Sequence, residues 1–193
     1  MDHIQTAKLA LRDQLLTARG RLALAEIGER ARATAAHLLA LPEIGHAATI
    51  AAYVSVGKEP GTGPLLDALH AAGKRVILPI VLPDLDLDWA VYAGDDSLAT
   101  ARRGLLEPIT PRLGKDAIAT ADVVIVPGLA ATIAGDRLGQ GGGCYDRALG
   151  RVPVGTPVIV VLNDEEVLAE LPVNTHDRKV GAIATASGVR RCR

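Results

Sequence analysis

Apolar residues follow two different periods along this chain. Near the N-terminus they recur every three or four positions, which predicts helices over residues 4–18 and about 22–40. After Pro42, short aliphatic runs alternate with turn residues and with one short helical pattern at 65–72. We expect strands at 47–54, 75–80, 85–92, 121–126, 157–162 and 182–185. This alternation predicts an α/β fold in which helices flank a mostly parallel central sheet.

The first predicted helix carries two cations within or beside its apolar stripe. Ile4, Leu11 and Leu15 fall on one face at helical spacing, Lys8 projects between them, and Arg12 lies one turn after Lys8. A lysine in such a place either runs its stem along the edge of the core to water or carries charge toward a buried anion. The spacing alone favours the first interpretation.

Composition restricts the class of protein. The chain has 193 residues, 49% of them hydrophobic, and a formal net charge of −1, so we expect one globular domain over residues 1–193. It has no basic surplus for binding nucleic acid and no apolar run long enough to span a membrane. Cys144 and Cys192 do not make a disulfide framework, so we expect a cytoplasmic protein.

The glycine-rich stretch Gly135–Arg147 is the strongest chemical feature. Five of its thirteen residues are glycine, and it follows the predicted strand at 121–126, where ligands of parallel sheets collect. Main-chain N–H groups, Arg137, Arg147 and the start of a helix together favour an anion, most often a phosphate. The stretch lacks the Lys-Ser/Thr pair of a P-loop, and Cys144 stands where a dinucleotide fingerprint needs its third glycine. A loose linker would be richer in serine, so a ligand loop is favoured.

Several neighbouring residues keep two interpretations open. Asp146 is placed either to meet a magnesium ion beside phosphates or to compensate the charge of a helix N-terminus. Asp177 is either a second metal ligand or a solvated turn residue, and His176 beside it is either a general acid/base or a plain loop residue; from the residues alone the second interpretation is favoured for both. Cys144 is either a nucleophile or a small residue that lines a pocket, and the second interpretation is favoured.

Two segments, Val126–Ala130 and Gly135–Arg147, together resemble the signature of the 5-formyltetrahydrofolate cyclo-ligase family. Shorter segments resemble other parts of that family in the same order, and the resemblance covers nearly the whole chain. These segments are Lys8–Arg12, Tyr53–Glu59, Gly73–Pro79, Gly104–Pro108 and Leu171–Asp177.

The resemblance implies a reaction and a fold. The reaction is the ATP- and Mg²⁺-dependent cyclisation of 5-formyltetrahydrofolate to 5,10-methenyltetrahydrofolate through a phosphorylated formyl group, with release of ADP and phosphate. The fold is the α/β type shared with sugar-phosphate isomerases and CoA transferases. The resemblance also reverses the preference for Lys8, which it places on the ATP phosphates. We expect a monomer whose partners are 5-formyltetrahydrofolate and ATP.

The resemblance further assigns roles to residues in or around the glycine-rich stretch. Expected ATP contacts are Lys8, Arg12, Arg137, Leu138, Gly139, Gln140, Gly141, Gly142, Gly143, Cys144 and Tyr145. Lys8 and Arg137 are also expected to act in catalysis, together with Arg147. Expected folate contacts are Val54, Glu59, Gln140, Gly141, Gly142, Gly143 and Cys144, and Asp146 and Asp177 are expected to hold magnesium.

Three positions depart from the usual pattern of that family. Ala131 and Thr132 stand where it has Phe-Asp, and Cys144 replaces the first of two tyrosines. We expect these changes to remove an aromatic wall and a carboxylate near the pocket. These changes keep open a non-catalytic folate- or nucleotide-binding protein. The shared fold keeps open a second alternative, a sugar-phosphate isomerase or CoA-transferase-like enzyme.

Overall fold

The computed structural model describes residues 3–174 and 177–193, apart from the side chain of Arg103. Its centre is a seven-stranded sheet in the order β12-β11-β9-β6-β1-β2-β3. The five inner strands run parallel, whereas the edge strands β3 and β12 are antiparallel to their neighbours. The strands are β1 (Thr49–Ala51), β2 (Arg75–Val81), β3 (Leu87–Val91), β6 (Val123–Pro127), β9 (Val158–Val161), β11 (Ala182–Thr185) and β12 (Gly188–Arg191).

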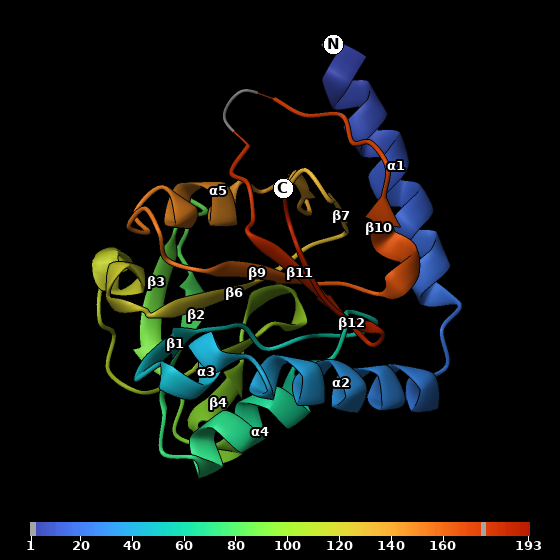
Figure 1. Cartoon of the computed structure of the whole chain (residues 1–193). Helices are drawn as coiled ribbons and strands as arrows, with labels where there is room; N and C mark the ends of the chain where they lie inside the picture. Colours follow the sequence, from blue (N-terminus) through green and yellow to red (C-terminus); the bar gives the residue numbers. More distant parts are fainter. Residues whose placement is uncertain (1–2, 175–176) are drawn as a thin grey trace.

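Helices cover both faces of this sheet (Figure 1). One face packs against α2 (Leu24–Leu39), α3 (Pro42–His46) and α4 (Gly63–Ala71). The other face packs against α5 (Cys144–Leu149) and the short helix η3 (Lys115–Thr120). Because every inner strand is covered on both sides, its residues are almost all apolar, as the continuous aliphatic runs predict.

Helix α1 (His3–Gly20) lies apart from these layers, upright beside β10 in Figure 1. It packs on a small cluster in which Leu15 meets Leu129, Ala130 and Leu138. This cluster is built on a second sheet, made of β7 (Ala130–Thr132), β8 (Arg137–Leu138) and β10 (Val167–Leu168). The remaining elements are β4 (Leu98–Thr100), β5 (Leu106–Pro108), η1 (Asp95–Ser97), η2 (Arg102–Gly104) and η4 (Asp164–Glu166).

The predicted α/β class and its parallel sheet are confirmed, with differences at the ends of elements. Strand β3 begins at Leu87 and not at residue 85, because Leu85 takes a positive φ of 63° in the turn before it. The first strand is shorter than predicted, since it leaves the sheet ladder after Ala51 toward the cavity described below. Ile4, predicted on the buried face of the first helix, is exposed. Within the described residues, no helix is long and apolar enough to span a membrane.

Candidate active site

The glycine-rich stretch leaves the sheet at the carboxyl end of β6. A tight hairpin, β7 to β8, turns the chain back, and Gly135 at its tip has a φ of 86°. A side chain at Gly135 would come within 2.6 Å of the Val180 carbonyl oxygen, so only glycine fits there. The loop 139–143 then follows β8 and leads directly into α5.

Three arginine side chains lie over alternate glycines of this loop. A Cβ atom at Gly139 would come within 3.1 Å of Arg137 Nη1, and one at Gly143 within 3.0 Å of Arg147 Nη1. At Gly141, where φ is +101°, a Cβ atom would come within 3.3 Å of the guanidinium carbon of Arg12. The missing side chains therefore leave a main-chain hollow lined by guanidinium groups, which suits a chain of phosphates.

Arg12 reaches this loop from α1 and binds it directly. Its Nε–H donates to the carbonyl oxygen of Gly139 at 2.8 Å. Arg147, from α5, holds the other end of the loop, because its Nη2 donates to the Gly142 carbonyl oxygen at 2.9 Å. The loop is thus fixed from two helices before any ligand arrives.

Lys8 is buried on the same face of α1 as Arg12. Its Nζ lies 2.5 Å from Asp177 Oδ2, and only 6% of the lysine side chain and 16% of the aspartate side chain are exposed. The Asn174 N–H donates to the same carboxylate oxygen at 2.7 Å. The interpretation that spacing alone favours for Lys8, a stem running out to water, is therefore wrong.

Arg137 and Asp146 form a second cation–carboxylate pair in the site. The Nη2 of Arg137 lies 3.1 Å from Asp146 Oδ1, and the Arg178 N–H donates to that oxygen at 3.2 Å. The Nη1 of Arg137 donates to the Pro127 carbonyl oxygen, while its buried Nε has no acceptor within the described residues. Its guanidinium carbon also lies 5.9 Å from the centre of the Tyr145 ring.

The loop after β1 supplies a carboxylate and a tyrosine. Glu59 accepts hydrogen bonds from the Val56 N–H at 3.0 Å and from Gln140 Nε2 at 2.9 Å. Burial raises the pKa of Glu59 and also the pKa of the Tyr53 and Tyr145 phenols. Both phenol hydroxyls are buried and have no partner in the part of the chain described, so each remains a protonated group ready to bond a ligand.

All these groups line one cavity of about 570 Å³. It opens at the carboxyl ends of β1, β2 and β6, the usual ligand edge of a parallel sheet. Every residue that the sequence predicts for the site lines this cavity, from Lys8 and Arg12 on α1 through Val54 and Glu59 to the stretch 137–147 and Asp177.

Sequence reasoning missed one wall of the cavity. This wall is largely apolar and faces the glycine loop from the β2–β3 hairpin and from β5. It consists of Pro79, Val81, Leu87, Leu105, Leu106 and Glu107. Some of these residues belong to two segments that carry the resemblance, Gly73–Pro79 and Gly104–Pro108. The resemblance could therefore have indicated this wall.

Two of the three unusual positions lie elsewhere. Ala131 and Thr132 are buried in β7 and do not line the cavity, so the expectation that they remove a wall and a carboxylate from the pocket is wrong. The Thr132 hydroxyl and the Asp136 carboxylate are hydrogen-bonded at 3.1 Å within the hairpin. Cys144 does line the cavity and forms no disulfide, whereas His176 lies outside the described residues.

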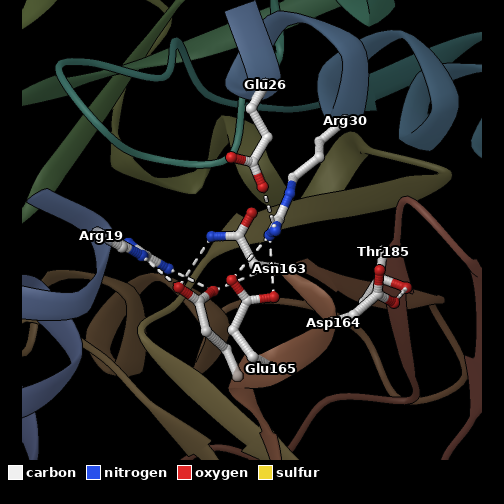
Figure 2. Close-up of polar contacts among 8 residues, drawn as sticks. Arg19, Glu26, Arg30, Asn163, Asp164, Glu165 and Thr185 are labelled. Atoms are coloured by element: carbon white, nitrogen blue, oxygen red, sulfur yellow. Dashed lines mark hydrogen bonds and ion pairs between the residues drawn. The ribbon is translucent and has the colours of Figure 1, made fainter. Parts of the chain in front are cut away.

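A buried ion pair fixes the C-terminal end of α1 to the site. Arg19 donates to both carboxylate oxygens of Glu166 at 2.6 and 2.8 Å and to the Gly128 carbonyl oxygen at 2.6 Å. Figure 2 shows Arg19 near Asn163, whose Nδ2 donates to the same Glu166 carboxylate at 2.9 Å. Since Lys8, Arg12, Leu15 and Arg19 share one face of the helix, this pair orients both cations toward the cavity.

The acidic residues of the cavity could hold magnesium only if a bound phosphate supplied further oxygen ligands. Residues 3–174 and 177–193 contain no group of three or more His, Cys, Asp or Glu side chains that would hold a metal ion alone. Magnesium needs one or two carboxylates when phosphate oxygens and water complete its shell. Asp146 and Asp177 line the same cavity as the cations Lys8, Arg12 and Arg137, which suits that arrangement.

The sheet and the cavity define the class as an α/β protein with a glycine-rich, arginine-lined loop beside a partly apolar pocket. Residues 4–186 match the model of the 5-formyltetrahydrofolate cyclo-ligase family, and the chain belongs to that family of enzymes.

Relatives with this name cover most of the chain. The chain is 44% identical over 134 residues to a 5-formyltetrahydrofolate cyclo-ligase of Mycolicibacterium smegmatis, which covers 67% of this chain and 69% of the relative. It is 32% identical over 167 residues to that of Escherichia coli K12, covering 85% and 90%. The NMR structure of 5,10-methenyltetrahydrofolate synthetase from Aquifex aeolicus superposes with a TM-score of 0.83 at 29% identity, covering 96% of this chain and 93% of that one.

Proposed function

We propose that this protein cyclises 5-formyltetrahydrofolate to 5,10-methenyltetrahydrofolate with Mg²⁺ and ATP, releasing ADP and phosphate. The observation that carries the proposal is the single cavity in which the arginine-covered glycine loop faces Glu59 and an apolar wall. Membership of the family supports the same activity. The two halves of the cavity suit the two substrates, a polyanion and a flat heterocycle.

The glycine loop and α1 form the proposed ATP side. Main-chain N–H groups of residues 139–143, with Arg12 and Arg137 beside them, would bind the phosphates, and Lys8 would reach them from α1. Arg147 at the end of the loop would neutralise charge that develops as the phosphoryl group moves. Asp146 and Asp177 would hold magnesium, which supplies charge neutralisation of the phosphates when bound.

The opposite side of the cavity is the proposed folate side. The Glu59 carboxylate would accept hydrogen bonds from pterin N–H donors, and Val54 and the apolar wall would contact the ring. Gln140 belongs to the glycine loop and bonds Glu59 at 2.9 Å. This contact supports adjacent binding of the two substrates, which transfer between them requires.

The chemistry explains why such a site needs no protein nucleophile. A formyl amide is a poor electrophile, and its oxygen is a poor leaving group. Transfer of the γ-phosphoryl group to the formyl oxygen releases ADP and solves both problems. N10 of the folate then attacks the formyl carbon and loses its proton, and the carbon–oxygen bond breaks with departure of phosphate. Positioning and charge neutralisation carry most of such a reaction.

Incubation with 5-formyltetrahydrofolate and Mg-ATP tests the proposal, because the methenyl product absorbs in the near ultraviolet. We expect absorbance to rise only when folate, ATP and Mg²⁺ are all present. Arg12→Met should slow the rise, whereas Arg32→Met, on the exposed face of α2, should not. Nucleotide binding without any absorbance change would instead favour a non-catalytic binding protein.

A further inference from the structure

The two carboxylates proposed to hold magnesium are bound to cations proposed to hold phosphate. Lys8 Nζ lies 2.5 Å from Asp177, and Arg137 Nη2 lies 3.1 Å from Asp146. These pairs line the same cavity. Two of the cations expected to bind phosphate are therefore already paired in the ligand-free site, and a phosphate that binds Lys8 must compete with Asp177 for it.

The two pairs differ in how the cation's charge and hydrogen-bond donors are distributed over its nitrogen atoms. Arg137 keeps a buried Nε–H without an acceptor among the described residues, so it can bond a further oxygen while it still holds Asp146. Lys8 carries its whole charge on one nitrogen, and that nitrogen sits against Asp177, so its charge is already compensated there even though the ammonium has further N–H donors. The competition therefore falls mainly on the Lys8–Asp177 pair.

We propose that Asp177 acts as an internal counter-anion that excludes polyphosphate without metal, because it holds Lys8 until a divalent cation takes the carboxylate over. This inference rests on the proposed function and concerns the selectivity of its nucleotide site. Asp177 thus serves the site in two states: as the partner of Lys8 when it is empty and as a metal ligand when it is full.

Burial makes the exchange depend on the metal. The Lys8 and Asp177 side chains are 6% and 16% exposed, so water screens their charges weakly. A metal-free polyphosphate that drew Lys8 away would separate the Asp177 carboxylate from this cation while bringing more negative charge into the same cavity, and like charges repel strongly where water screens them weakly. A polyphosphate carrying Mg²⁺ would give the released carboxylate a new cation. The metal, more than the phosphate chain, makes the exchange favourable.

Titration calorimetry with inorganic tripolyphosphate, in EDTA and in Mg²⁺, tests this inference without catalysis. The unmodified protein should bind it weakly in EDTA and tightly in Mg²⁺. In Asp177→Asn, metal-free binding should tighten by about tenfold or more, since Lys8 is released and a negative charge is lost. The enhancement by Mg²⁺ should shrink in the same variant.

Two further variants separate this mechanism from a change in net charge. Asp13→Asn removes the same charge at an exposed position of α1 that does not line the cavity, and it should bind tripolyphosphate like the unmodified protein. Adding Lys8→Met to Asp177→Asn should abolish the gain, because the released cation is missing. Asp177→Ser repeats the loss of charge with a different side chain, and thermal melting confirms that each variant is folded.

The possible failures are distinguishable. Mg²⁺-dependent binding by the unmodified protein together with unchanged or weaker metal-free binding by Asp177→Asn would overturn this inference and leave the proposed function standing. No binding of tripolyphosphate in either buffer would overturn the phosphate site itself, and the inference with it.

Discussion

Replacing Glu166 by Gln should destabilise the protein by about 3–5 kcal/mol, the usual cost of breaking a buried ion pair by changing one partner. The Arg19 and Glu166 side chains are 4% and 3% exposed, so water cannot solvate the positive charge that Arg19 would keep without its partner. Glu166 also accepts bonds from the Asn163 N–H and Nδ2, and an amide would turn an NH₂ group toward one of these donors. For a chain of this length, the loss corresponds to a melting temperature lower by roughly 6–20 °C.

The neighbouring residue provides a matched control. Glu165 lies in the same short helix and pairs with Arg30, as Figure 2 shows, but its side chain is 51% exposed. Exposed pairs contribute about 0–1 kcal/mol, so Glu165→Gln should melt almost like the unmodified protein. Thermal unfolding followed by circular dichroism measures both variants. If Glu166→Gln were within about 1 kcal/mol of Glu165→Gln, the buried pair would not be the anchor of α1 that we infer.

Three further predictions concern the cavity. Lys8→Ala should raise the ATP KM or lower kcat by about tenfold or more, because a phosphate counter-charge is lost. Unchanged kinetics would mean that Lys8 only pairs with Asp177 and does not contact the phosphates. Burial raises the pKa of Glu59, so its cost to stability grows as pH rises from the unfolded toward the folded pKa. Glu59→Gln should therefore flatten the decline of melting temperature across this window while it raises the folate KM, and parallel melting profiles would refute the assignment. Cys144→Ser should leave turnover largely intact, and loss of activity would mean that the thiol does more than line the cavity.

The sequence predicted which residues line the cavity better than it predicted their surroundings. The glycine spacing and the flanking arginines carry their chemistry locally, so Arg137 and Arg147 were identifiable without a fold. The apolar run at 121–126 predicted that these arginines lie beyond the carboxyl end of a parallel strand, where ligands collect. The resemblance to a family then placed Lys8, Glu59 and Asp177, which no spacing rule connects to a loop so distant in sequence.

Tertiary pairing explains what the sequence could not predict. Whether Lys8 runs to water or to an anion depends on Asp177, 169 residues away. The anchor of α1 depends equally on Glu166, which stands among three consecutive acidic residues whose pattern suggests only a solvated surface. The hairpin strands β7 and β8 are too short for a period-2 pattern, so the burial of Ala131 and Thr132 away from the cavity was not visible.

A crystal structure with Mg²⁺ and a non-hydrolysable ATP analogue tests the central claim most directly. Our account predicts that the phosphates lie against the N–H groups of residues 139–143, with the guanidinium groups of Arg12 and Arg137 on either side. A nucleotide bound elsewhere on the molecule, with this loop unoccupied, would contradict it.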